Sequence, residues 1–291
     1  MIRTIDLHFL GRRQSIAAYL IGTSATGYAL VESGPFSTHE TLLAQLATWG
    51  VAPAEVTAVL LTHIHFDHAG AAWWWAARGA RIYVHPRGHK HLANPTRLYN
   101  SARRIYGERM EELWGDMRGI DAERLVAVPD REELTINGQR WTAHHTPGHA
   151  SHHIAWQLGA DVFTGDVGGV SVNGGPVVPP CPPPDIDHAA WAASIERLRS
   201  LGAATFYLTH YGPTPATPGH LDQLAQRLAS YREWIQPHAA AGTPVEKLIP
   251  QFEAFAREEL RRAGVGEADL ARYAVANPPA MSVAGLLRAE G

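Results

Sequence analysis

Three histidines and an aspartate crowd residues 63–68, which read His-Ile-His-Phe-Asp-His. The apolar residues 56–61 before them are typical of a buried β-strand, and residues 69–78 after them are typical of a helix. The cluster therefore lies on a turn between a strand and a helix. Imidazole combined with carboxylate suits zinc or a comparable first-row ion, whereas magnesium or calcium would call for more oxygen ligands. We predict a metal site at this turn.

The four candidate ligands at this turn cannot easily converge on one tetrahedral ion, because neighbouring side chains on an extended segment point to opposite sides. Two adjacent metals are the natural interpretation, and they require further ligands at other strand ends. His149, Asp166 and His210 each follow a short apolar or aromatic run. Any one of them alone would more often be an ordinary satisfied polar residue. Their joint presence behind the histidine-rich turn favours metal ligation.

These motifs resemble, in type and order, those of the metallo-β-lactamase-fold hydrolase superfamily. The likeness consists of His-x-His-x-Asp-His at 63–68, Pro-Gly-His at 147–149, Gly-Asp at 165–166 and the late His210, within roughly residues 15–212. It implies an α/β fold, the αββα sandwich, with metals at one edge of two packed sheets. It also implies two ligand groups joined by one bridging carboxylate: His63, His65 and His149; Asp67, His68 and His210; and Asp166 between them.

The proposed ligand set indicates a class of chemistry. An Asp at the bridging position is similar to glyoxalase II and the lactonases, whereas Cys or Ser there would look more like true β-lactamases. A hydroxide shared by two divalent ions is nucleophilic near neutral pH, because coordination lowers the pKa of water from about 15.7 to about 7. We expect a hydrolase of an ester, thioester or lactone, with Asp67 as a catalytic residue. Its cofactors would be two divalent ions, zinc first, with iron or manganese as alternatives.

Two alternatives stay open. A phosphodiesterase would use the same geometry on phosphorus, and an iron-dependent persulfide dioxygenase would hold one iron with a similar set of histidines. A nuclease is disfavoured, because the net charge is −3 and no cluster of Lys and Arg provides a basic stripe. A diiron electron-transfer protein is disfavoured because that branch has Glu at the position of His65. A non-catalytic binding protein is disfavoured because every proposed ligand is present.

Short apolar runs and helical patterns alternate in two rounds, as in α/β domains. The first round predicts strands at 2–9, 16–22, 27–32, 56–61 and 81–84, with helices at 38–49 and 69–78. The second predicts strands at 124–128, 133–136, 139–145, 153–158, 161–164 and 204–208, then a helix near 189–201 with Asp187 as its N-cap. We expect a catalytic domain over residues 1–216 and a helical extension over 217–291. The extension would either pack on the site or mediate a homodimer.

Residues 86–120 form the main insertion of the catalytic domain. Tyr99, Arg103 and Tyr106 fall at helical spacing on roughly one face, which would suit a lid that offers a hydroxyl or guanidinium to a small-molecule substrate. A solvated amphipathic helix explains the same pattern equally well. The proline-rich residues 174–184 are predicted to be a stiff loop near the mouth of the site. Residues 73–75, three tryptophans, are predicted to pack between helix and sheet.

Glu32 stands where relatives usually have Asp, in the sequence Val-Glu-Ser-Gly at residues 31–34. If this acid orients a ligand histidine, its longer side chain requires an adjusted geometry. The alternative is that it merely ends a strand. Of the seventeen histidines, several lie outside the proposed site and are expected on the surface: His39, His89, His91, His220 and His238.

The expected compartment is the cytoplasm. The single cysteine, Cys181, excludes intrachain disulfides, and no apolar segment approaches the ~20 residues needed to span a bilayer. Arg12 and Arg13 precede an apolar run too short for an export signal. We therefore expect a small-molecule substrate as the partner, and neither nucleic acid nor membrane.

Overall fold

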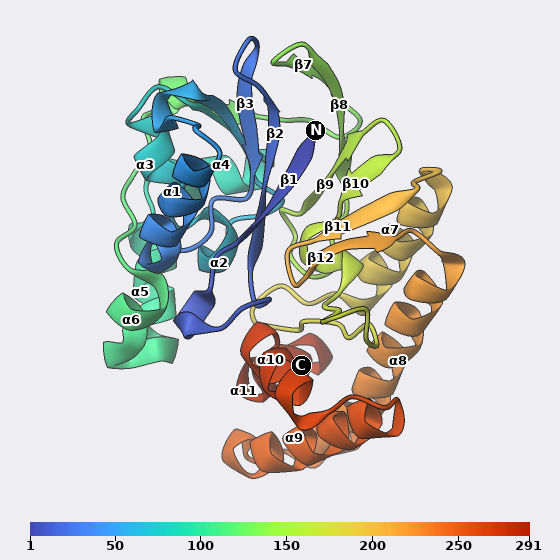
Figure 1. The fold of residues 1–291 in the computed structure, drawn as a ribbon. Helices are drawn as coiled ribbons and strands as arrows, with labels where there is room; N and C mark the ends of the chain where they lie inside the picture. The colour runs from blue at the N-terminus through green and yellow to red at the C-terminus, as the bar shows by residue number, and fades with distance from the viewer.

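The computed structural model describes residues 1–291 and has four layers, two packed sheets with helices outside each (Figure 1). The first sheet is built, in order, from β1 (Ile2–Asp6), β2 (Ala17–Thr23), β3 (Gly27–Val31), β4 (Val56–Leu60), β5 (Arg81–Val84) and β6 (Leu125–Ala127). The second is built, in spatial order, from β12 (Gly212–Pro215), β11 (Thr205–Leu208), β10 (Asp161–Phe163), β9 (Ile154–Leu158), β8 (Gln139–His145) and β7 (Glu133–Ile136). The αββα prediction is confirmed.

Strand β2 shows why the strands read as continuous apolar runs. Tyr19 lies in the hydrophobic cluster between the sheets, whereas Leu20 lies in the cluster that faces the helices. Successive side chains of a strand point to opposite faces, so a strand covered on both faces is apolar throughout. Trp141 and Trp156 of the second sheet are fully buried in the cluster between the sheets.

The predicted strands are all present, but β12 was missed. Pro213 and Pro215 are unfavourable in the interior of a sheet, because proline has no N–H to donate. The structure places β12 at the edge of its sheet, where a residue without an N–H is tolerated.

Helices α1 (His39–Thr48), α2 (Phe66–Ala69) and α3 (Ala72–Ala76) cover the first sheet. The helix expected at 69–78 is present as the shorter α3, and a separate short helix, α2, begins earlier at Phe66. Trp75 is fully buried and Trp73 and Trp74 are half-buried against the same core, as predicted for this run.

Two of the histidines expected on the surface are buried, which corrects that prediction. His39 stacks on Phe36, with ring centroids 5.3 Å apart, and lies against Trp74. The Nε2 atom of His220 lies 2.8 Å from the carbonyl oxygen of Gly168. His89, His91 and His238 are half-buried.

Helices α7 (His188–Ser200) and α8 (Pro218–Ala240) cover the second sheet. The backbone N–H of Ala190 donates to the Asp187 carboxylate at 2.9 Å, which confirms Asp187 as the N-cap of α7.

Asp187→Ala should lower the free energy of unfolding by about 1 kcal/mol, because the first turn of α7 loses its capping acceptor. Urea denaturation measures this difference. Asp121→Ala is the matched control, since Asp121 is exposed and its side chain caps no helix. Equal losses of unfolding free energy in the two variants would mean that the Asp187 cap does not stabilise the fold.

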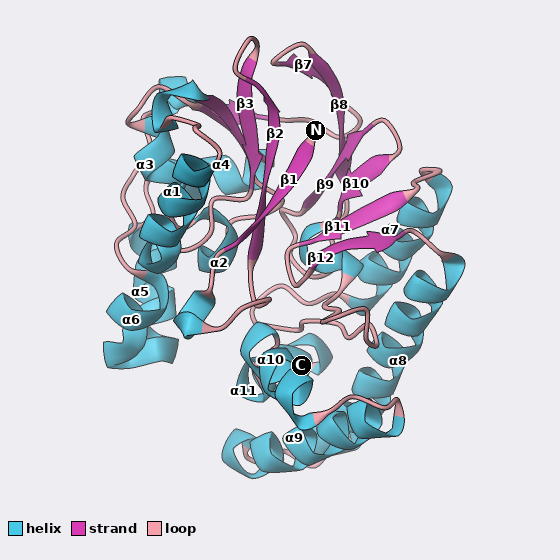
Figure 2. Cartoon of the chain, viewed as in Figure 1, coloured by secondary structure: helices cyan, strands magenta, loops and turns pink.

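The insertion forms α4 (Pro86–Ala93), α5 (Thr96–Tyr106) and α6 (Met110–Trp114). The C-terminal extension continues from α8 into α9 (Val245–Arg262), α10 (Glu267–Ala276) and α11 (Pro279–Glu290). Figure 2 shows α10 and α11 beside the loops at one end of the sheets. Residues of the extension, among them Leu224 and Leu286, share one hydrophobic cluster with Phe206 of β11. The domain division at residue 216 stays a prediction.

No helix in the structure combines the length and the apolarity that crossing a membrane requires.

Candidate metal centre

All seven candidate ligands follow the ends of strands. His63 and His65 come after β4, Asp67 and His68 lie in α2, and His149 follows β8. Asp166 lies in the 3-10 helix after β10, and His210 follows β11. Strands β8, β10 and β11 run in the same direction, so their carboxyl ends lie at one edge of their sheet. Strand β4 carries its ligands to the same edge of the sandwich, where the seven side chains meet.

Two glycines let these loops approach closely. Gly148 has φ 137°, and a Cβ there would lie 2.3 Å from the Cα of Trp191. Gly165 has φ 50°, and a Cβ there would lie 2.6 Å from the hydroxyl of Thr62. Glycine is therefore required beside His149 and beside Asp166.

The first ligand group is His63, His65 and His149. The Nδ1 atom of His65 lies 2.9 Å from the Nε2 atom of His63 and 3.1 Å from that of His149. The second group is Asp67, His68 and His210. One carboxylate oxygen of Asp67 lies 3.6 Å from the Nε2 atom of His68 and 3.4 Å from that of His210. Within each group the ligand atoms lie within 4.8 Å of one another, close enough to share one ion.

Asp166 lies between the two groups. Its Oδ2 atom is 3.2 Å from the Nε2 atom of His149, in the first group. Its Oδ1 atom is 3.3 Å from the Nε2 atom of His68 and 3.5 Å from that of His210, in the second. Each oxygen of one buried carboxylate thus faces a different group.

Backbone carbonyls hold two of the ligand rings. The Nδ1 atom of His149 lies 2.9 Å from the carbonyl oxygen of Pro180, in the proline-rich loop. The Nδ1 atom of His210 lies 2.6 Å from the carbonyl oxygen of Ser15. A carbonyl accepts only from N–H, so these contacts place the proton on Nδ1 and leave Nε2 free as a ligand.

Glu32 holds the ring of His68, a candidate ligand, in the same way. It is fully buried, and one of its oxygens lies 2.9 Å from the Nδ1 atom of His68. The hydroxyls of Thr62 and Thr209 donate to this oxygen at 2.5 and 3.2 Å. These contacts support the interpretation that the carboxylate of Glu32 orients the ring of His68, rather than the alternative that Glu32 merely ends a strand.

The donor set and its surroundings fit a metal. The Nε2 atom of His68 and the Oδ1 atom of Asp166 are buried without a hydrogen-bond partner, a state that is rare and costly in proteins. Burial lowers the pKa of His63 and of His149, and burial together with His149 lowers the pKa of His65 to about 4. These imidazoles are therefore neutral at pH 7, the form that binds a cation.

The charge around His68 points the same way. Burial lowers the pKa of His68, but the carboxylates of Asp166, Asp67 and Glu32 outweigh burial and raise it. Burial likewise raises the pKa of Asp67, but the charge of His68 and a hydrogen bond from His210 outweigh it and lower that pKa to about 2. Three carboxylates surround one imidazole, an excess of negative charge that a bound cation would neutralise.

A cavity of about 650 Å³ opens onto these ligands and is lined by His65, Asp67, Asp166 and His210. Tyr106 also lines it, whereas Tyr99 and Arg103 do not. Tyr99 is half-buried against Phe66, with ring centroids 6.3 Å apart, and Arg103 is exposed.

Helix α5 therefore presents a different face to the cavity from the one that its polar side chains suggest. The residues of α5 that line the cavity are Leu98, Ser101, Ala102, Ile105 and Tyr106. Their spacing of three to four residues is visible in the sequence, but the expectation of a lid rested on polar groups alone.

His153 is a buried residue at the site that sequence reasoning did not single out. Its ring stacks on that of His63 with centroids 5.2 Å apart, and its Nδ1 atom lies 2.8 Å from the hydroxyl of Thr146. The signal for it was the His-His pair at 152–153, just after His149. Cys181, by contrast, lies in the hydrophobic cluster under the second sheet, where burial raises the pKa of its thiol.

Comparison with known proteins gives a match to the metallo-beta-lactamase superfamily over residues 11–210. The metallo-beta-lactamase fold-containing protein ST1585 of Sulfurisphaera tokodaii is 30% identical over 158 residues, which are 53% of this chain and 60% of that protein. The match thus spans less than two thirds of the relative's length.

Two solved structures share the fold. The archaeal superfamily protein ST1585 from Sulfolobus tokodaii has a TM-score of 0.62 at 22% identity, over 79% of this chain and 85% of its own. The metallo-beta-lactamase family protein TTHA1429 from Thermus thermophilus has a TM-score of 0.63 at 24% identity, over 81% of this chain and 82% of its own.

Proposed function

The chain belongs to the metallo-beta-lactamase superfamily, made up mostly of metal-dependent hydrolases, and from this premise we propose that it is a dinuclear hydrolase of esters, thioesters or lactones. One observation carries the proposal. The two oxygens of Asp166 face two separate ligand groups, which is the arrangement that a carboxylate shared by two cations requires.

Each ligand group would hold one of the two ions. His63, His65 and His149 would bind the first, and Asp67, His68 and His210 the second. Divalent ions held there would activate a water molecule as the nucleophile near neutral pH and would polarise the substrate carbonyl. Zinc suits this mixture of imidazole and carboxylate best, with iron and manganese as alternatives. The Asp at position 166 also supports the glyoxalase II and lactonase branch.

Asp67 fits the catalytic role proposed for it. Its side chain is 22% exposed and lines the cavity, so its carboxylate can accept a hydrogen bond from a water molecule there. That hydrogen bond would orient the water toward the substrate carbonyl.

Tyr106 is the part of the proposed lid that can contact a substrate. Its hydroxyl has one weak partner, the sulfur of Met281 at 3.6 Å, and is therefore free to donate to a substrate oxygen. Burial and the charge of Asp67 raise the pKa of this phenol, which keeps its proton in place.

The metal-loaded protein should hydrolyse an activated thioester such as phenyl thioacetate, or a simple lactone. Its rate should rise with pH through an apparent pKa of about 7, the value typical of a metal-activated water. Removal of the metal with a chelator should reduce the rate to background, and added zinc, manganese or cobalt should restore it. Metal analysis alongside absorbance assays measures both effects.

Two results would replace this proposal. Activity on bis(4-nitrophenyl) phosphate with none on acyl substrates would favour a phosphodiesterase. Bound iron together with oxygen consumption in the presence of glutathione persulfide would favour the dioxygenase.

A further inference from the structure

The cavity beside the metal ligands is much larger than hydrolysis of a small acyl group requires. Its volume of about 650 Å³ lies in the range of pockets that enclose a drug-sized ligand. Two segments that supply no metal ligand form much of its wall. The insertion contributes Leu98, Ala102 and Ile105, and the extension contributes Val275 and Met281.

The mouth of this cavity is apolar. Of the four large hydrophobic side chains that the protein exposes, Leu10 and Ile105 line the cavity, with exposed fractions of 39% and 51%. Exposed apolar side chains beside a pocket are typical of a ligand-binding site. The walls therefore favour a substrate with a long apolar body.

The charges on the wall have one sign. Apart from the ligands Asp67 and Asp166, the only Asp, Glu, Lys or Arg residues that line the cavity are Arg109 and Arg288. Arg109 pairs with Glu112 at 3.0 Å, whereas Arg288 makes no ion pair. Arg288 is exposed, whereas Asp166 and His210 are buried and His65 and Asp67 are half-buried, so this unpaired cation lies closer to solvent than the candidate ligands do.

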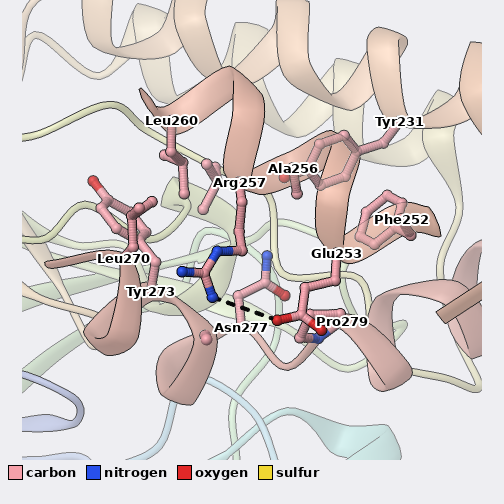
Figure 3. Close-up of a pocket in the computed structure, with 12 residues that line it drawn as sticks. Tyr231, Phe252, Glu253, Ala256, Arg257, Leu260, Leu270, Tyr273, Asn277 and Pro279 are labelled. Atoms are coloured by element: carbon pink, nitrogen blue, oxygen red, sulfur yellow. Dashed lines mark ion pairs between the residues drawn. The ribbon is translucent and has the colours of Figure 1, made fainter. Parts of the chain in front are cut away.

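The other hollow in the extension does not compete as a binding site. Figure 3 shows it lined by residues of α9 and α10, with an ion pair of 3.6 Å between Glu253 and Arg257 of α9. Its volume of about 30 Å³ is enough for a water molecule and too small for a substrate.

We propose that the large cavity selects an amphipathic acyl substrate, with a long apolar chain along the walls and a terminal carboxylate paired with Arg288. The inference rests on the proposed function for the position of the reacting carbonyl at the metal ligands. The insertion and the extension thereby determine specificity, and they do so through residues that take no part in the chemical step.

Two series of 4-nitrophenyl esters test the proposal. One series carries neutral chains from acetate to decanoate, and the other consists of monoesters of dicarboxylic acids of the same lengths. Each buried methylene should raise kcat/KM by up to about fourfold until the cavity is filled. The terminal carboxylate should add a further factor of up to about five, the upper range for an ion pair at an exposed site.

Variants test which residues produce the gains in kcat/KM from chain length and from the terminal carboxylate. Arg288→Gln should remove the preference for the acid over the neutral ester, whereas Arg104→Gln should keep it, because Arg104 is exposed and does not line the cavity. Ser101→Phe, which fills the cavity from α5, should abolish the gain with chain length. Asn100→Phe is its control, since Asn100 is exposed on the same helix and off the wall.

A binding experiment separates this inference from the proposed function. Calorimetry with the monoamide of decanedioic acid, which keeps the chain and the carboxylate but resists hydrolysis, reports on the cavity alone. Tight binding that weakens in Arg288→Gln, without hydrolysis of any ester, would preserve the cavity assignment and overturn the hydrolase. Hydrolysis of short esters with no effect of chain length or carboxylate would overturn the cavity assignment and leave the hydrolase standing.

Discussion

Asp166→Ala should lower kcat/KM by about 10³-fold or more and release most of the bound metal. The bridging carboxylate is expected to supply several kcal/mol of stabilisation between two cations, and each 1.36 kcal/mol is a factor of about ten in rate. In the variant, the Nε2 atoms of His149 and His68 would face the site without the negative charge that now lies 3.2 and 3.3 Å from them.

Elemental analysis, kinetics and circular dichroism together test this expectation, the last to show that the fold survives. Asp166→Asn keeps the shape of the side chain but loses its negative charge, so this variant should also lose most of its metal and activity. His89→Ala is the control, because His89 lies in α4 outside the ligand groups and should retain both metal and activity. An active Asp166→Ala enzyme with two bound ions would reject the bridging role.

Glu32→Asp should weaken metal binding by about 10- to 100-fold, the usual effect of losing a group that orients a ligand. The loss of one methylene would withdraw the carboxylate from the Nδ1 atom of His68, now 2.9 Å away. Glu32→Ala should additionally destabilise the fold by about 3–5 kcal/mol. It would leave His68 and the hydroxyls of Thr62 and Thr209 buried without their acceptor.

Competition with a chromophoric chelator measures the affinity, and urea denaturation of the metal-free protein measures the stability. Glu40→Asp makes the same chemical change on the exposed face of α1 and should alter neither. Unchanged affinity in Glu32→Asp would mean that the ring of His68 is held by other contacts.

The candidate ligands could be found from the sequence because each lies in a short motif at a strand end. The strands could be predicted because both of their faces are covered, as at Tyr19 and Leu20, so each strand is a continuous apolar run in the sequence. Strand β12 could not be predicted, because its prolines are tolerated only at a sheet edge and the sequence does not show which strand lies there.

The apolar spacing on α5 is visible in the sequence, but the residues of α5 alone do not show which of its faces lines the cavity. Its rotation is set by partners distant in the chain, among them Phe66, which contacts Tyr99. The same limit applied to His39 and His220, which are buried by aromatic and backbone partners that no local pattern reveals. For Glu32 the sequence left two roles open, orienting a histidine or ending a strand. Its contacts with Thr62, His68 and Thr209 in the structure support the first role.

The wall of the large cavity lies partly beyond the region that matches the superfamily. That match ends at residue 210, whereas Arg288 and the neighbouring wall residues of the extension come from the last two helices. In evolutionary terms, we expect that mutation of the extension can change which molecules enter the cavity while the candidate ligands stay unchanged. For engineering, exchange of residues 274–288 between relatives is expected to change the selectivity and to leave the candidate ligands in place.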